Sequence, residues 1–305
     1  MQAFIEYLDS ISLPADSGRL FHGRGGRFGG SEHLCLDWFA PVLLLTSFRE
    51  LPEQELASLQ QSLTAFWTRV AAAQPFNLVY QYRAGGQTQT RLLAGEVPER
   101  HVVTENGCQY LVHLLRGQNH GLFLDMREGR HWVKQHSQGK RVLNLFAYTC
   151  GFSVAAMAGG AQAVINIDMA KGALSVGKQN HQLNGFDKGV SFLGHDIFSS
   201  WGKLRKLGAY DLIIADPPSN QKGSFVATKD YVRLLRKLPE LLTSEGELLL
   251  CLNAPELSTQ FLQEQVTNAA PELEYLQRLA NPPVFADIDE ERSLKVLRYR
   301  KPATE

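Results

Sequence analysis

The sequence lacks the features that mark membrane, secreted and zinc-binding proteins. No apolar run approaches the roughly 20 residues that a helix needs to cross a membrane. The amino terminus, MQAFIEYLDS, carries acids where a signal peptide carries basic residues. The four cysteines lie far apart and form no CxxC motif, which argues against a disulfide framework and a structural zinc site. We therefore expect a cytoplasmic protein with reduced thiols, no metal and no membrane partner.

An excess of charge of either sign is also missing. The 31 basic and 31 acidic residues give a formal net charge of zero. This sum does not favour a nucleic-acid partner, because phosphate binding relies on Lys and Arg, although it is compatible with a basic face opposite an acidic one. A length of 305 residues with 44% hydrophobic content is typical of a globular protein with room for two domains.

The stretch from Arg141 to Asp168 has the pattern of half a nucleotide-binding α/β unit. An apolar run at 142–146 predicts a buried parallel strand, residues 152–158 favour a helix, and a second strand at 163–167 ends on Asp168. An acid at this position commonly binds ribose, because two adjacent hydroxyls donate to one carboxylate. The alternative interpretation of Asp168 is a helix N-cap.

The chain after this stretch alternates between strand and helix patterns. Further strands are predicted at 190–193, 211–215, 247–252, 273–279 and 294–299, and helices at 171–183, 198–207, 228–242 and 258–269. This alternation predicts a Rossmann-like α/β domain with a mostly parallel seven-stranded sheet and helices on both faces. Asp168, Asp196 and Asp216 would end three parallel strands, which capping alone does not explain.

Residues 1–117 predict a smaller α+β domain with a mostly antiparallel sheet, a candidate for RNA or substrate recognition ahead of the α/β domain at 118–305. An apolar stripe predicts a helix over 51–73, and Asn106-Gly107 predicts a hairpin turn. Near the amino terminus, a glycine-rich loop at residues 23–30 carries Arg24 and Arg27. It fits either a flexible connection between strands or a basic loop that binds phosphates or RNA.

Two loops argue against a nicotinamide cofactor. The first strand of the α/β domain is followed by a single glycine, Gly151, where dinucleotide folds need several so that the backbone approaches the pyrophosphate. The fourth strand is followed by Asp216-Pro217-Pro218, in which the prolines make the loop rigid. A nicotinamide oxidoreductase, though disfavoured, stays open as an alternative, as does a nucleic-acid-binding protein with an inactive cofactor fold.

Five segments resemble the S-adenosylmethionine-dependent methyltransferases of bacterial large-subunit ribosomal RNA, in particular the N7-guanine and C5-cytosine enzymes. They are GLFLDMREGR, NLFAYTCGFSVAAMAGGA, NIDMAKGALSVGKQNHQLNGF, GHDIF and DLIIADPPSNQKGSF. The resemblance spans about residues 119–300. It implies S-adenosylmethionine as the cofactor and RNA, 23S ribosomal RNA in particular, as the partner. We expect a monomer or a homodimer.

The resemblance also implies roles for individual residues. Asp168 would bind the ribose hydroxyls, Met169 would pack on the adenine, and Asp196 with Ile197 would face the adenine edge. The whole implied cofactor set is Phe123, Arg127, Asn144, Phe146, Tyr148, Thr149, Gly151, Asp168, Met169, Asp196, Ile197 and Asp216. The implied catalytic residues are Asp216, Pro217, Pro218 and Asn253. For Phe146 and Met169, a place in the core is the alternative.

Which atom of the base receives the methyl group depends on whether a cysteine thiol lies at the site of transfer. Methylation of cytosine C5 requires a thiolate that first attacks C6. In the C5-cytosine enzymes of the family this cysteine follows the fifth strand, where the present chain has Asn253, with Cys251 on the same face. The aromatic residue expected for amino-group methylation is displaced to Phe225. Guanine N7 needs only alignment, because its lone pair attacks directly, and we favour it over C5.

Basic residues after the Asp-Pro-Pro loop recur at helical spacing. Lys229, Arg233 and Arg236, together with Arg24 and Arg27, form a predicted RNA-binding track. The alternative is an ordinary solvated helix face.

Overall fold

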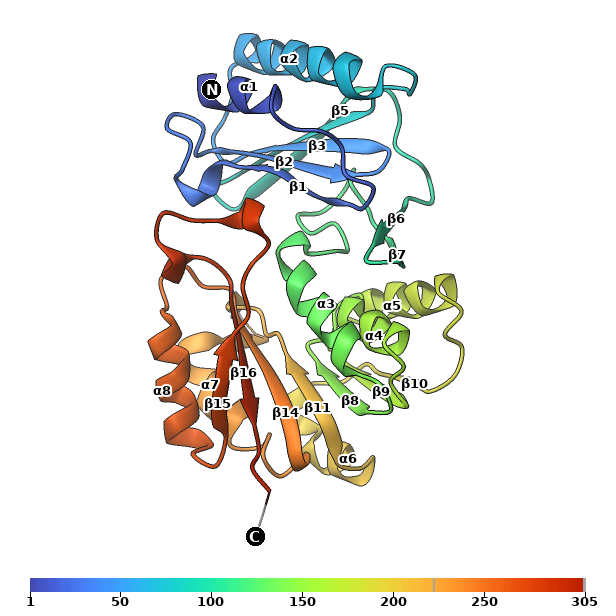
Figure 1. The fold of residues 1–305 in the computed structure, drawn as a ribbon, viewed down its shortest axis with the longest axis vertical. Coiled ribbons are helices and arrows are strands. Elements are labelled where there is room, and N and C mark those ends of the chain that lie inside the picture. The colour runs from blue at the N-terminus through green and yellow to red at the C-terminus, as the bar shows by residue number, and fades with distance from the viewer. Residues whose placement is uncertain (222, 304–305) are drawn as a thin grey trace. The chain divides into compact units, whose positions relative to one another are not determined.

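The structure is a computed structural model that describes residues 1–221 and 223–303 (Figure 1). The chain divides into two compact units, one of Met1–Asp125 with Pro282–Glu290, the other of Met126–Asn281 with the residues from Glu291 onward. The boundary expected from the sequence lay at residue 117, and the sequence did not associate 282–290 with the first part. Within the described ranges, no helix has both the length and the apolar character needed to cross a membrane.

The first unit contains a five-stranded sheet in the order β1-β2-β3-β4-β5. Only β3 and β4 pair in parallel, across the connection formed by α2, which matches the predicted α+β domain with a mostly antiparallel sheet. A separate hairpin is formed by β6 and β7. The elements are α1 (Gln2–Leu8), β1 (Gly18–His22), η1 (Gly23–Gly25), β2 (Leu34–Phe39), β3 (Val42–Ser47), α2 (Glu53–Ala71), β4 (Leu78–Ala84), β5 (Gln87–Ala94), β6 (Val102–Glu105) and β7 (Cys108–Leu111).

Two sequence patterns in the first unit are confirmed. The apolar stripe of α2 is buried in one cluster with residues of β2, β3 and β4, as the three- and four-residue spacing predicts. Between β6 and β7, Asn106 has φ 51° and Gly107 has φ 74°. Two consecutive left-handed residues are what a tight two-residue hairpin turn requires.

The second unit contains a seven-stranded sheet in the order β10-β9-β8-β11-β14-β16-β15. The first five of these strands run in parallel, and β16 is antiparallel to both of its neighbours, which confirms the predicted mostly parallel sheet. Its strands are β8 (Arg141–Leu145), β9 (Ala163–Ile167), β10 (Val190–Leu193), β11 (Tyr210–Ala215), β14 (Leu242–Leu252), β15 (Glu274–Arg278) and β16 (Lys295–Arg300). Its α-helices are α3 (Arg127–His136), α4 (Gly151–Ala158), α5 (Lys171–Leu183), α6 (Trp201–Lys206), α7 (Ala227–Leu235) and α8 (Thr259–Ala269).

Helices cover both faces of this sheet, as Figure 1 shows. Successive side chains of a strand point to opposite faces. On β8, Leu143 is buried in a cluster with residues of α7 and α8, and Val142 is buried in another cluster with residues of α3 and α4. A sheet buried on both sides explains why its strands appear in the sequence as continuous apolar runs.

The helix bounds differ from the sequence prediction at two places. The segment before β8, for which no helix was predicted, forms α3, whose buried face includes Trp132 and Val133. The helix predicted over 228–242 ends at Leu235, and residue 242 already belongs to β14. Pro239 lacks the amide that a continuing helix would need, so the apolar residues around it are buried in turns instead.

Candidate cofactor and acceptor site

The carboxyl ends of five parallel strands meet at one edge of the sheet in the second unit. The strand order reverses between β8 and β11, and ligands of open α/β sheets bind beside such a reversal at the carboxyl edge. Most of the predicted site residues of this unit lie in the loops that follow these strands: Phe146, Tyr148, Thr149, Gly151, Asp168, Met169, Asp196, Ile197, Asp216, Pro217, Pro218 and Asn253.

The loop after β8 has an unusual backbone. Phe146, Tyr148 and Cys150 have φ values of 55°, 48° and 62°, in the left-handed region that favours glycine. Each such residue costs on the order of 1–3 kcal/mol and persists only where the surroundings fix it, most often at functional sites. Left-handed residues in loops of this kind orient backbone amides toward anionic groups. The loop therefore adopts, at residues other than glycine, backbone conformations that usually need glycine.

The Asp168 carboxylate is held by two backbone amides. Its Oδ2 accepts from the Tyr148 amide at 2.8 Å, and its Oδ1 accepts from the Ala170 amide at 2.7 Å. The N-cap position of α5 is occupied by Ala170, so Asp168 is not the N-cap of that helix. Each carboxylate oxygen has a second lone pair, which leaves capacity for a ribose diol. The next side chain, Met169, is 52% exposed, so an apolar surface adjoins this carboxylate.

The side chains of Asp196 and Ile197, after β10, mainly contact other parts of the protein. Asp196 caps the short helix η3 (Ile197–Ser199), because its Oδ1 accepts from the Phe198 amide at 3.1 Å. The side chain of Ile197 is buried in the core cluster on the α7 side of the sheet. A contact of Asp196 with the adenine edge stays a prediction, and for Ile197 only the backbone remains as a candidate group.

Asn144 lies within β8 and belongs to a buried polar chain. Its Nδ2 donates to Asn166 Oδ1 at 2.9 Å, and Asn166 Nδ2 donates to Ser153 Oγ at 3.0 Å. Ser153 Oγ lies 2.8 Å from His181 Nε2, and His181 Nδ1 lies 2.7 Å from the Gly177 carbonyl. Burial lowers the pKa of His181, so its ring is neutral at pH 7. The carbonyl must accept from Nδ1, which leaves Nε2 to accept from the Ser153 hydroxyl.

Replacing Asn144 by Ala is expected to lower the stability of the protein more than its affinity for the cofactor. The substitution leaves Asn166 Oδ1 without this donor in the core, which costs about 1–3 kcal/mol of the free energy of unfolding. Urea unfolding measures this cost, and Gln179→Ala on the exposed face of α5 is the matched control. Unchanged stability together with a large loss of S-adenosylhomocysteine affinity would instead support direct binding by Asn144.

The loops after β11 and β14 are joined to each other. Ser219 Oγ donates to the Asn253 carbonyl, and Tyr231 on α7 donates to the Cys251 carbonyl. Burial raises the pKa of Tyr231 well above its usual range, and the nearby Cys251 and Asp216 act in the same direction. The Tyr231 hydroxyl therefore stays protonated as a donor. Neither Ser219 nor Tyr231 carries a sequence signal beyond its position near the Asp-Pro-Pro loop.

An aromatic contact connects the segment after β11 to the loop after β8. Phe225 is buried, and its ring lies 5.3 Å from the ring of Phe146 and 5.0 Å from that of Tyr231, both nearly edge to face. Phe225 thus packs in the core and does not stand in the open as a platform for a flipped base. The contact fixes the loop after β8 against the segment that follows Asp216.

The remaining predicted residues belong to other segments of the chain. Phe123 is exposed but belongs to the first unit, whereas Arg127 begins α3. Arg233 lies 4.2 Å from the Phe198 ring centre and donates to Asp230 at 2.7 Å. The other predicted RNA-binding residues are exposed, Lys229 and Arg236 in the second unit and Arg24 and Arg27 in the first. No metal-ligand group of three or more His, Cys, Asp or Glu occurs within 1–221 and 223–303.

The sheet order and the acids at its carboxyl edge define a Rossmann-like, nucleotide-binding α/β domain. A sequence profile of the S-adenosylmethionine-dependent methyltransferases matches residues 18–300. The chain belongs to this family, and S-adenosylmethionine is its cofactor. The match does not favour the nicotinamide oxidoreductase. The fixed carboxylate of Asp168, the exposed Met169 and the left-handed loop fit such a cofactor.

Relatives and solved structures agree with this family. Ribosomal RNA large subunit methyltransferase I of Aeromonas salmonicida is 30% identical over 284 residues, 89% of this chain and 72% of the relative. The protein of the same name from Enterobacter sp. is 30% identical over 293 residues, 92% of this chain and 73% of the relative. A structure from Streptococcus mutans, described as a SAM-dependent methyltransferase, gives a TM-score of 0.83 at 28% identity and covers 98% of this chain and 80% of that chain.

A second structure, of a methyltransferase complexed with S-adenosylhomocysteine, gives a TM-score of 0.81 at 26% identity. The superposition covers 98% of this chain and 78% of that chain. Both units of the present chain are therefore included in the shared fold.

Proposed function

We propose that this methyltransferase modifies a base of large-subunit ribosomal RNA, 23S ribosomal RNA in bacteria. The relatives that share about nine tenths of the chain carry the name of such an enzyme, which supports RNA as the acceptor. The observation that carries the proposal is the joining of the loops after β11 and β14, at Ser219 and Asn253, which we call the acceptor edge. The hydrogen bond from Ser219 to Asn253 and the contact of Phe225 with Phe146 join the loops after β11, β14 and β8, which supports one shared site for the cofactor and the acceptor.

The residues at this edge have distinct proposed roles. When bound, S-adenosylmethionine supplies an electrophilic methyl group on a sulfonium. Asp168 holds the ribose, and the loop after β8 surrounds the methionine part. Asp216 and Asn253 offer carboxylate and amide groups that hydrogen-bond the edge of a guanine, while Pro217, which is buried, keeps the loop rigid. Alignment of this kind is sufficient for a nitrogen lone pair that attacks the methyl carbon directly.

The burial of the cysteine thiols supports guanine N7 over cytosine C5 as the atom that is methylated. Cys251, the thiol nearest to the position that C5 chemistry needs, is fully buried in the cluster on the α3 and α4 side of the sheet. The thiols of Cys35, Cys108 and Cys150 are also buried. Burial raises the pKa of Cys150, with Asp168 acting in the same direction, so this thiol close to the cofactor loop is protonated and unreactive.

Substituting Cys251 by Ala is therefore expected to leave the rate of methyl transfer per folded molecule unchanged. The thiol is part of the core, so the substitution costs stability only, by about 1 kcal/mol. Transfer of tritiated methyl groups to RNA measures the rate, and the melting temperature reports the folded fraction. If the variant folds but transfers nothing, a covalent C5 mechanism through Cys251 replaces the direct one.

Nucleoside mass spectrometry of ribosomal RNA tests the proposed acceptor. RNA from cells with and without the protein is digested to nucleosides and compared. We expect 7-methylguanosine to decrease in cells that lack the protein and 5-methylcytidine to stay constant. A decrease of 5-methylcytidine alone would overturn the choice of atom, and identical spectra would overturn ribosomal RNA as the substrate.

A further inference from the structure

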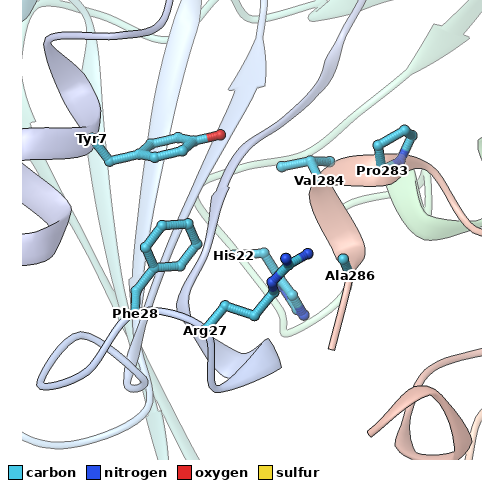
Figure 2. Close-up of a pocket in the computed structure, with 7 residues that line it drawn as sticks. All are labelled: Tyr7, His22, Arg27, Phe28, Pro283, Val284 and Ala286. Atoms are coloured by element: carbon cyan, nitrogen blue, oxygen red, sulfur yellow. The ribbon is translucent and has the colours of Figure 1, made fainter. Parts of the chain in front are cut away.

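A pocket of about 370 Å³ opens in the first unit between the glycine-rich loop and the segment 282–290. Figure 2 shows the rings of Tyr7 and Phe28 on one side, Val284 and Ala286 on the other, and the side chain of Arg27 reaching between them. His22 and Pro283 complete the lining. Every residue of this lining belongs to the first unit, whereas the strands that carry the predicted cofactor residues belong to the second.

Both walls of the pocket are fixed by packing. The rings of Tyr7 and Phe28 meet edge to face, with centres 5.1 Å apart and planes at 71°. Opposite them, the Ile288 amide donates to the Gly25 carbonyl at 2.9 Å. A Cβ atom on Gly25 would lie 2.2 Å from the Ala286 carbonyl oxygen, so only glycine allows this approach. The glycine-rich loop is therefore a rigid wall, and a ligand would meet a preformed shape.

The polar side-chain groups of the lining are the Arg27 guanidinium, the His22 ring and the Tyr7 hydroxyl. Arg27 is exposed, and no residue within 1–221 and 223–303 forms an ion pair with it. Burial, with the charge of Arg19, lowers the pKa of His22 to about 4, so its ring is neutral at pH 7. Its Nδ1 lies 2.8 Å from an Arg19 nitrogen that can only donate, which places the proton on Nε2. The nearby carboxylate of Asp287 accepts from the amide two residues later.

We propose that this pocket binds one unpaired base of an RNA strand, with the adjoining phosphate at Arg27. The wall formed by Tyr7 and Phe28 provides an aromatic surface for a planar base, and His22 Nε2 offers a donor to a base acceptor. The volume is in the range of sites for one small ligand. A base within a duplex is already stacked and cannot enter, so the site selects single-stranded or looped RNA. This inference rests on RNA as the substrate of the methyltransferase.

Filling the pocket tests the inference. Val284→Trp places a large ring inside it, and Ile288→Trp makes the same kind of change at a neighbouring side chain that is 75% exposed and outside the lining. The probe is a fluorescently labelled single-stranded RNA, alone and annealed to its complement. We expect Val284→Trp to weaken binding of the single strand about tenfold, as for loss of one stacked base. Ile288→Trp is expected to bind the single strand like the wild-type protein. The affinity for the duplex is expected to be the same in all three proteins.

A second variant keeps the inference testable if Val284→Trp does not fold. Arg27→Gln lies on the surface and is expected to weaken single-strand binding and lower the slope of log affinity against log salt by about one. Wild-type affinity in both variants would overturn the proposal that this pocket binds an unpaired RNA base. Absence of single-strand binding by the wild-type protein would overturn it too. Methyl transfer to ribosomal RNA is measured separately: its absence overturns the proposed function even where the pocket variants weaken RNA binding.

Discussion

The affinity for S-adenosylhomocysteine is expected to fall about 10- to 100-fold when Asp168 is replaced by Asn, because charge-assisted hydrogen bonds contribute about 1.5–3 kcal/mol. The carboxylate accepts from the amides of Tyr148 and Ala170, and the ribose diol is proposed to donate to the same two oxygens. An asparagine offers only one oxygen, and its NH₂ group would face an amide N–H. Isothermal titration calorimetry measures the affinity.

The matched control is Asp187→Asn, which removes the same charge from an exposed loop after α5. This control is expected to bind S-adenosylhomocysteine like the wild-type protein. Melting temperatures show whether the Asp168 variant keeps its fold. If it binds the cofactor with wild-type affinity while folded, the ribose is held elsewhere, and the assignment of this edge as the cofactor site is wrong.

Replacing Asp216 by Ala is expected to lower the rate of methyl transfer at least 100-fold, in the range that a misplaced acceptor causes. The affinity for S-adenosylhomocysteine is expected to change little. Asp216 directly follows β11 and lies near Tyr231 at the joined acceptor loops, so its proposed task is to hold the base. Single-turnover transfer of tritiated methyl groups to RNA measures the rate, and calorimetry measures cofactor binding.

Glu256→Ala serves as the control for this experiment. Glu256 is an exposed acid in the loop after β14, so its removal changes the charge near the acceptor edge without touching the proposed base contact. We expect wild-type transfer from this variant. Equal loss of transfer in both variants would indicate a general effect of charge on RNA binding, and full activity of the Asp216 variant would remove Asp216 from the acceptor site.

The architecture of the second unit was predictable from the sequence because its determinants are local and periodic. Strands buried on both faces give continuous apolar runs, and the acids at 168, 196 and 216 lie one to three residues after the strands end. The family of the chain followed from motifs at these same strand ends. The α3 helix was missed because its first turn is charged and its apolar face consists of few residues, including Trp132.

Features that depend on contacts between distant segments were not predictable. Nothing local in residues 282–290 indicates that they form one wall of a pocket with the glycine-rich loop near the amino terminus. The left-handed conformations of Phe146, Tyr148 and Cys150 contradict the usual preference of these residue types, so the sequence showed only a loop with one glycine. The partner of the Asn144 side chain, Asn166, depends on the register of β8 and β9.

Transfer of tritiated methyl groups from S-adenosylmethionine to RNA from a strain that lacks the protein tests the central claim most directly. The purified chain is incubated with this RNA, and label in the RNA is counted before and after digestion to nucleosides. We predict that label enters large-subunit ribosomal RNA and is recovered in a methylated guanine. No incorporation into RNA by a protein that binds S-adenosylhomocysteine would contradict the account and leave a nucleic-acid-binding protein with an inactive cofactor fold.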